Sequence, residues 1–305
     1  MLEKIFPRKN LSVSEKKYEP GQATKDIKAA FPPGHFYSPI VDPGEININD
    51  LWPDHRRPIF GIDFNETSHK QILKEDFPRF IGEYDYPEKE SQTSETHSFF
   101  TQNGQFSWLD SRLAFVLLRK WNPRHFIEVG SGFSSLLIAD INKRFFNSNC
   151  DIVCIDPYPR DFLKKGVPGI SSLIEAKVQD VPLSLFEKIH AGDVLFIDSS
   201  HVSKTGSDVN YLYFEVLPRL REGVIIHIHD VFLPNEYLKG WVIEENRSWN
   251  EQYVLRALLM YSSAFRVIFG SAYAYSVMPD LLSEGLRFSD RRIFGGGSFW
   301  IKKLF

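Results

Sequence analysis

The sequence has 305 residues, enough for one large domain or two smaller ones around a substantial core. Apolar residues make up 43% and charged residues 25% of the chain, a globular balance that argues against disorder and against a membrane protein. The 36 basic and 39 acidic residues give a formal charge of -3, without the basic excess that is typical of nucleic-acid-binding proteins.

The first 97 residues are expected to form an N-terminal arm and a cap on a larger domain that covers residues 98–305. The segment 31–43 carries aromatic residues between prolines, and the prolines exclude a regular helix. This segment is expected either to lie across the larger domain as a strap or to line a pocket. Residues 68–77 are predicted to form a short helix because apolar residues recur four positions apart.

A glycine-containing turn follows the first predicted strand. The apolar run at 125–129 predicts a buried strand, and Gly130 and Gly132 come directly after it. These glycines allow a tight turn and a close approach of backbone to a ligand. A helix predicted from Phe133 points its N-terminal amides at whatever lies over the turn. The three parts form the nucleotide-binding corner of a doubly wound sheet, and the loop 102–106 is expected near it.

A Gly-x-Gly turn fits a dinucleotide, an adenosyl cofactor or no ligand. Ser135 stands where the dinucleotide fingerprint has its third glycine, and Glu128 lies two residues before the first glycine. S-adenosylmethionine has no pyrophosphate but carries an ammonium and a sulfonium group, so a carboxylate at the end of the strand suits it. The pattern therefore favours the adenosyl cofactor.

Beyond the turn, predicted strands and helices alternate as a parallel sheet requires. Further strands are predicted at 151–156, 171–178, 193–198, 223–229, 265–269 and 295–303, with helices at 109–121, 160–165, 183–189, 207–220 and 248–261. The last strand is expected to be antiparallel. The predicted fold is therefore an α/β, Rossmann-like, doubly wound sheet of seven mostly parallel strands, with an N-terminal cap segment.

Acidic residues close several of these strands, at the edge of the sheet where ligands bind in open α/β folds. Asp156 is placed to bind the ribose hydroxyls of a cofactor, or else to cap the turn that follows it. Asp180 could accept a hydrogen bond from the adenine amine while Val181 packs on the ring. An ordinary loop acid is the alternative for Asp180.

Two acids and two histidines are expected to meet at the ends of the fourth and fifth strands. Asp198 and Asp230 close these strands, with His201 three residues after the first acid and His229 just before the second. Carboxylate oxygens suit Mg²⁺ or Mn²⁺, and a His229 ligand would favour Mn²⁺. His227 lies deeper in its strand and is expected to be a core histidine.

His201 is a candidate general base. Methyl transfer to an alcohol requires loss of the hydroxyl proton, and an imidazole of pKa about 6.5 can accept that proton at neutral pH. General-base catalysis of this kind contributes roughly 10²–10⁴ in rate. The alternative is that His201 only caps the loop after Asp198.

These motifs resemble a known family. The runs Glu-Val-Gly-Ser-Gly at 128–132, Phe-Ile-Asp-Ser-Ser-His at 196–201 and Ile-His-Ile-His-Asp at 226–230 resemble class I S-adenosylmethionine-dependent methyltransferases. Residues 98–303 resemble the branch of macrocin O-methyltransferase and related natural-product sugar O-methyltransferases. Segments 35–40 and 156–159 resemble a bacterial subgroup of unassigned substrate.

The resemblance implies a set of cofactor-binding residues and a metal site. The implied cofactor contacts are Glu128, Gly130, Gly132 and Asp156. The full set of expected cofactor-binding residues also includes Ser131, Pro157, Asp180, Val181 and Asp198. In metal-dependent relatives the acid ending strand four and an acid pair ending strand five hold Mg²⁺, and a Lys or His base follows the first acid by three residues. Asp198, Asp230 and His201 match this pattern, whereas His229 stands where relatives often have a carboxylate.

The expected activity is S-adenosylmethionine-dependent O-methylation of a small hydroxylated molecule, with or without a sugar, assisted by a divalent metal and a His base. Metal-independent N- or carboxyl-methylation, a nicotinamide-dependent oxidoreductase and a cofactor-binding protein without catalysis are the alternatives. No nucleic-acid or membrane partner is expected, and a homo-oligomer is left open. Two cysteines, Cys150 and Cys154, give no disulfide framework, and the sequence shows no signal peptide, so a cytoplasmic location is expected.

Overall fold

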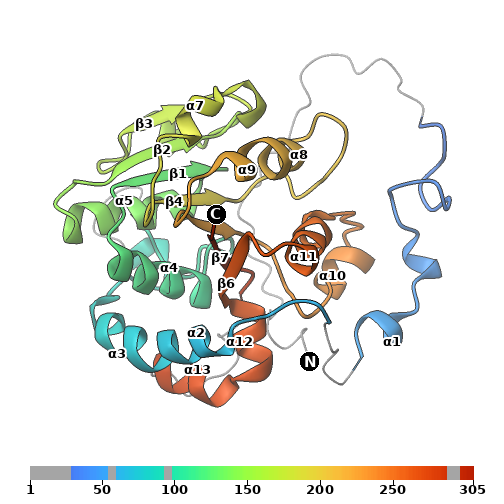
Figure 1. Cartoon of the computed structure of the whole chain (residues 1–305), viewed down its shortest axis with the longest axis horizontal. Helices are drawn as coiled ribbons and strands as arrows, with labels where there is room; N and C mark the ends of the chain where they lie inside the picture. Colours follow the sequence, from blue (N-terminus) through green and yellow to red (C-terminus); the bar gives the residue numbers. More distant parts are fainter. Residues whose placement is uncertain (1–28, 54–59, 93–97, 287–295) are drawn as a thin grey trace.

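The computed structural model describes residues 29–53, 60–92, 98–286 and 296–305. Its centre is a seven-stranded sheet in the order β3-β2-β1-β4-β5-β7-β6, with helices on both faces (Figure 1). The strands are β1 (His125–Val129), β2 (Asp151–Ile155), β3 (Ser172–Ile174), β4 (Val194–Ile197), β5 (Ile225–Ile228), β6 (Phe265–Gly270) and β7 (Phe299–Lys303). Strands β1 to β5 pair in parallel, and β7 runs antiparallel between β5 and β6. The predicted fold class is confirmed.

The helices of the described ranges mostly cover the sheet. They are α1 (Ile48–Leu51), α2 (Glu66–Gln71), α3 (Phe77–Phe80), α4 (Trp108–Trp121), α5 (Phe133–Phe145), α6 (Asp161–Lys164), α7 (Leu183–Phe186), α8 (Asp208–Tyr211), α9 (Leu217–Arg219), α10 (Lys239–Ile243), α11 (Glu251–Tyr261), α12 (Ser271–Val277) and α13 (Pro279–Leu286). Among these described helices, none combines the length and the apolar character that crossing a bilayer would require.

The sheet separates two hydrophobic clusters because successive strand side chains point to opposite faces. In β1, Phe126 packs into the cluster that contains the apolar residues of α4 and α5. Ile127 and Val129 pack into the second cluster, with residues of α8 and α11. Glu128 shares the face of Phe126, so its carboxylate is directed toward α5. This alternation decides where the acid of the glycine motif lies.

Two predicted helices contain a widened turn before a proline. Residues Ile72–Asp76 and Leu212–Val216 are π-helical, and Pro78 and Pro218 follow them within two residues. Proline lacks the N–H of an α-helical bond, and its ring collides with the carbonyl four residues earlier. The wider π turn moves that carbonyl away, so each helix continues past its proline.

Some boundaries differ from the predictions. The strand expected over 171–178 ends at Ile174, because Ala176 N–H donates to the Ile174 carbonyl at 2.9 Å and turns the chain. Helices α12 and α13 were not predicted.

Residues 1–28 of the expected N-terminal arm lie outside the described residues, while Ile72 and Phe77 of the expected cap pack in the same cluster as α4. The division at residue 97 stays a prediction.

Candidate active site

The carboxyl ends of β1, β4 and β5 lie side by side, because these strands are neighbours in the sheet. Asp198 follows β4 directly, and its N–H donates to the Val129 carbonyl at the end of β1 (2.8 Å). Asp230 follows β5 by two residues. The expectation that both acids close neighbouring strands is confirmed.

The glycine turn is packed against the end of β4. Gly130 has a φ of +83°, and a Cβ added there would lie 1.7 Å from the backbone oxygen of Asp198. Only glycine fits this position, for both its conformation and its space. The N–H of Gly130 donates to the Ile155 carbonyl at 2.9 Å, which ties the turn to β2 as well. The turn is therefore held rigidly between its two neighbouring strands.

Glu128 is fully buried and faces helix α5. Its two carboxylate oxygens accept hydrogen bonds from Ser134 (2.6 Å) and Ser135 (2.5 Å), and the Cys154 thiol donates at 3.3 Å. Burial raises the pKa of Glu128 to about 7, although the hydrogen bonds oppose the shift. Glu128 thus anchors the start of α5 to β1. Its expected contact with a cofactor stays a prediction.

Asp156 lies at the end of β2 and bridges two backbone segments. One oxygen accepts from Ser131 N–H at 2.9 Å, and the other accepts from Tyr158 N–H at 2.7 Å, across Pro157. A carboxylate has about four acceptor positions, so each oxygen keeps capacity for a ligand hydroxyl. Asp156 therefore orders the turn after β2, which is the second role considered for it, and its contact with ribose hydroxyls stays a prediction.

The two residues expected at the adenine differ in exposure. Asp180 is exposed at the end of a 3₁₀ turn, whereas Val181 is 4% exposed and packs in the second hydrophobic cluster. The Tyr211 hydroxyl donates to the Val181 carbonyl at 2.9 Å, which holds this turn against α8. Their contact with an adenine ring stays a prediction.

The loop expected near the glycine corner does lie there. Gln105 Oε1 is 3.8 Å from the position of a Cβ on Gly132, and it accepts from the Arg160 guanidinium at 2.8 Å. The ring of Phe106, at the end of the same loop, is 5.5 Å from the ring of His229. The loop therefore extends from the glycine turn to the histidines.

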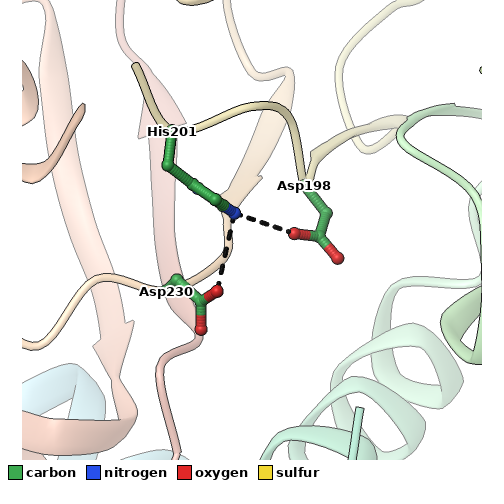
Figure 2. Close-up of side chains that lie close together, drawn as sticks. All are labelled: Asp198, His201 and Asp230. Atoms are coloured by element: carbon green, nitrogen blue, oxygen red, sulfur yellow. Dashed lines mark ion pairs between the residues drawn. The ribbon is translucent and has the colours of Figure 1, made fainter. Parts of the chain in front are cut away.

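An acid and imidazole cluster lies beyond β4 and β5. Nε2 of His201 is 3.4 Å from Oδ1 of Asp198 and 3.5 Å from Oδ2 of Asp230 (Figure 2). One ligand atom from each residue falls within 4.8 Å of the others, as in a metal site. The φ angles of His201 (+60°) and Asp230 (+55°) are left-handed, a strained conformation that clusters at functional sites.

His229 joins the same two acids from the other side. Its Nδ1 lies 3.5 Å from Asp198 Oδ1 and 3.6 Å from Asp230 Oδ1, and its Nε2 lies 3.5 Å from Asp110 Oδ2. The side chain is 5% exposed, yet neither ring nitrogen makes a hydrogen bond. His227 is fully buried against Phe196, with ring centroids 3.8 Å apart, which confirms it as a core histidine.

Charge in this cluster is set by burial and by pairing. Burial alone would lower the pKa of His201, but Asp198, Glu251 and Asp230 raise it to about 10. The pKa of Asp198 is held below its usual range by both histidines, against the effect of burial. Burial raises the pKa of Asp230. Without a ligand, the cluster is therefore a network of paired charges with a protonated His201 at neutral pH.

Two acids at the site were not predicted. Glu251 is 1% exposed at the start of α11, and its Oε2 lies 2.9 Å from His201 Nδ1. Asp110 of α4 accepts from the N–H groups of Gly297 (3.0 Å) and Ser298 (2.9 Å). Each acid lies in the first turn of a predicted helix, a place where a solvent-exposed acid is common. Only the folded chain shows that they are buried beside the histidines.

The aromatic segment at 31–43 differs from the expected strap. Its rings pack on one another, with Phe36 over Tyr37 at 4.0 Å between centroids, and both side chains are exposed. The attachment to the domain comes later, where Trp52 Nε1 donates to the Tyr237 carbonyl at 2.8 Å. The cysteines are free and buried, as expected.

Comparison with known proteins places this site in a family. Residues 127–231, which include the glycine turn and both acids, match the family described as a methyltransferase domain. An uncharacterized protein from Archaeoglobus fulgidus is 35% identical over 172 residues, covering 54% of this chain and 76% of the archaeal protein.

Two solved structures are also similar to this chain. A DUF574 family protein from Streptomyces avermitilis has a TM-score of 0.40 and 14% identity, over 63% of this chain and 80% of that one. A proposed methyltransferase from Thermobifida fusca has a TM-score of 0.40 and 13% identity, over 62% of this chain and 77% of that one. On the sequence match, the chain belongs to the same family as the Archaeoglobus fulgidus protein, and its residues 127–231 match the methyltransferase-domain family.

Proposed function

We propose that this protein is an S-adenosylmethionine-dependent methyltransferase that methylates a hydroxyl group of a small molecule. The observation that carries the proposal is the position of the acid and imidazole cluster. Asp198 supplies the backbone oxygen against which Gly130 packs, and its side chain belongs to the cluster with His201. A glycine turn for a cofactor and a proton-accepting cluster thus share one edge of the sheet.

The residues at the glycine turn fit an adenosyl cofactor. Asp156 keeps acceptor capacity for ribose hydroxyls. The hydroxyl oxygens of Ser131 and Ser199 are buried and make no hydrogen bond, so a ligand could satisfy them. In this proposal Gly130, Gly132 and Asp156 hold the cofactor, which supplies a methyl carbon bonded to a sulfonium.

The residues of the cluster fit a divalent cation. The N···O separations of 3.4 to 3.6 Å between the imidazoles and Asp198 or Asp230 exceed the 2.7–2.9 Å of charge-assisted hydrogen bonds. They are wider than the roughly 3.0 Å between adjacent ligands of an octahedral cation with bonds of about 2.1 Å, so the side chains would move together by about half an ångström on binding. In this proposal Asp198 and Asp230 hold Mg²⁺ or Mn²⁺ with His229 as the third ligand, as first expected, although the three residues whose ligand atoms lie within 4.8 Å of one another include His201 instead. The cation would lower the pKa of a bound hydroxyl.

The remaining imidazole, His201, would accept the hydroxyl proton at Nε2. As the side chains stand, the ring holds a proton at neutral pH because its pKa is about 10. Neutralising the charges of Asp198 and Asp230 would lower that pKa toward its ordinary value and free Nε2 as a base. The ring of His201 would thus accept a proton once a cation neutralises Asp198 and Asp230, which is what methylation of an alcohol requires.

Transfer of a labelled methyl group from S-adenosylmethionine to panels of alcohols, phenols, glycosides, amines and carboxylic acids tests the proposal. We expect label in hydroxylated acceptors, its loss with EDTA and its return with Mn²⁺. Full activity in EDTA would contradict the metal. Label only in amines or carboxylic acids would contradict O-methylation, and turnover of a nicotinamide cofactor instead would contradict the whole proposal.

A further inference from the structure

The ring of His201 is held from both sides by carboxylates. Its Nε2 faces Asp198 and Asp230, whereas its Nδ1 lies 2.9 Å from Oε2 of Glu251. The second distance is that of a charge-assisted hydrogen bond, and the first two are longer. Of the three acids around the ring, Glu251 is therefore the one that binds it directly.

Burial of the Glu251 carboxylate is energetically unfavourable, and the position of Glu251 at the start of α11 does not explain it. The side chain is 1% exposed, and its Oε1 makes no hydrogen bond. Burial of a carboxylate is unfavourable unless the group is paired. Glu251 begins α11, where an exposed acid would stabilise the helix equally well. The burial therefore serves the contact with His201.

The backbone around this pair is fixed by the same helix end. The carbonyl of His201 accepts from the N–H groups of Asn250 (3.0 Å) and Glu251 (3.1 Å). The Asn250 side chain accepts from Ser203 N–H (2.6 Å) and donates to its carbonyl (3.2 Å). These bonds hold His201 at its left-handed φ of +60°. Ring and backbone are thus both attached to α11.

We infer that Glu251 is a positioning residue, which keeps the proton of His201 on Nδ1 and leaves Nε2 as the working atom. The inference rests on the role proposed for His201. In neutral imidazole one nitrogen donates and the other accepts, and a carboxylate can only accept. When the ring of His201 is neutral, Glu251 therefore keeps the remaining proton on Nδ1 and leaves the lone pair on Nε2, the nitrogen that faces Asp198 and Asp230.

The second histidine of the cluster shows that this arrangement is specific to His201. Nε2 of His229 lies 3.5 Å from Asp110, without a hydrogen bond. The Asp110 oxygens are engaged instead by Gly297 and Ser298, so Asp110 holds the β7 end of the chain. In both histidines one ring nitrogen faces away from Asp198 and Asp230. In His201 this nitrogen is hydrogen-bonded to a carboxylate, whereas in His229 it is not.

Proton NMR of protein labelled with ¹⁵N at histidine tests the inference without a cofactor or a metal. A proton bonded between Nδ1 and a carboxylate gives a far-downfield resonance, and its coupling to ¹⁵N assigns it to a histidine ring. His125 Nδ1 also lies 2.9 Å from a carboxylate, that of Asp193, so His125→Gln identifies any resonance that belongs to that ring. We expect a further resonance that disappears in His201→Gln and moves upfield in Glu251→Gln. Glu236→Gln is the matched control, because Glu236 also contacts α11, through Gln252 and Tyr253, and it should leave the resonance unchanged.

Kinetics give the second readout. The amide of Glu251→Gln can accept from Nδ1 or donate to it, so the tautomer is no longer selected. In a Ser-His-Asp triad the equivalent carboxylate-to-amide change lowers kcat by about 10⁴. We expect kcat to fall by roughly 10²–10⁴ with the KM for S-adenosylmethionine unchanged, and Glu251→Asp to recover part of the loss.

The outcomes separate this inference from the proposed function. If no wild-type resonance is lost in His201→Gln, or if the resonance of His201 persists unchanged in Glu251→Gln, the inference is overturned whether or not the protein transfers methyl groups. If the resonance behaves as expected but no methyl transfer occurs, the Glu251–His201 pair stands and the proposed function fails. Thermal unfolding of each variant identifies any that does not fold. In that case the resonance that remains in His125→Gln belongs to His201, and its presence or absence decides.

Discussion

Nε2 of His201 lies 3.4 Å from Oδ1 of Asp198, only three residues earlier in the chain. An extended segment could not bring the two together so closely, since three residues span roughly 10 Å when extended. The left-handed φ of His201 and the bonds from α11 to its carbonyl fold the loop back over the end of β4. The acid and the imidazole therefore meet because a strained loop is held in place by a distant helix.

The first prediction concerns metal binding by the acid pair. Asp198→Asn and Asp230→Asn should each weaken Mn²⁺ binding at least about 100-fold, because even indirect partners of a metal site contribute 10–100-fold. Electron paramagnetic resonance of free Mn²⁺ measures the change. Asp76→Asn is the control, since Asp76 pairs with Lys120 at 2.6 Å outside the cluster. Equal Mn²⁺ affinity in Asp198→Asn and Asp76→Asn would exclude the proposed site.

The second prediction concerns the space at the glycine turn. Gly130→Ala should destabilise the protein by roughly 2–5 kcal/mol, because its Cβ would collide with the Asp198 backbone and its φ would be strained. Gly104→Ala has a similar φ of +78° but no atom within 4 Å of the Cβ, so only strain of about 1–2 kcal/mol is expected. Urea unfolding compares the two variants. Equal stability would show that the turn is not closely packed.

The third prediction is a loss of stability in acid that depends on His69. Its Nε2 accepts from Gly270 N–H at 2.8 Å, and burial lowers the pKa of His69 to about 4 from its usual 6.5. As the pH falls, the unfolded chain therefore binds this proton before the folded chain does. The contribution of neutral His69 to the free energy of unfolding is complete above pH 6.5 and is lost as the pH falls toward 4. The loss amounts to about 3 kcal/mol. In urea unfolding, the free energy of unfolding of His69→Gln should fall by about 3 kcal/mol less than that of the wild type between pH 6.5 and pH 4. An equal pH dependence in the two proteins would refute the assignment.

The fourth prediction has the opposite sign and concerns Glu128. Burial raises the pKa of Glu128 to about 7 from 4.5, so the folded state keeps a proton that the unfolded chain releases. Its contribution is complete below pH 4.5 and is lost as pH rises toward 7, again by about 3 kcal/mol. Glu128→Gln should therefore gain stability relative to wild type between pH 5 and pH 8. The effects of Glu128 and His69 should nearly cancel in the wild-type protein, and a Glu128→Gln variant that loses stability over this range would contradict the assignment.

Much of the fold could be predicted because its signals are local. Short and largely apolar runs mark β1, β2, β4 and β5. A glycine turn follows β1, and an acid follows β2, β4 and, after His229, β5. Helix α12 carries no such signal. Its residues Ser271 to Ala274 are all buried, so the helix lacks the polar face that would reveal its period.

The site could be predicted only as far as neighbouring strand ends specify it. Asp198 and Asp230 meet because β4 and β5 pair, which the alternation of elements indicates. Glu251 lies 50 residues after His201, and nothing near it in the sequence distinguishes it from an exposed acid in the first turn of a helix. The direction of Glu128 toward α5 depends on which sheet face that helix covers, which is a property of the folded chain.

The most direct test of the central claim is calorimetric titration of the protein with S-adenosylhomocysteine, beside NAD⁺ and beside the Gly130→Ala variant. The account predicts saturable binding of one S-adenosylhomocysteine per chain, no binding of NAD⁺, and loss of binding in the variant. Absence of binding to the wild-type protein, or binding of NAD⁺ alone, would contradict it.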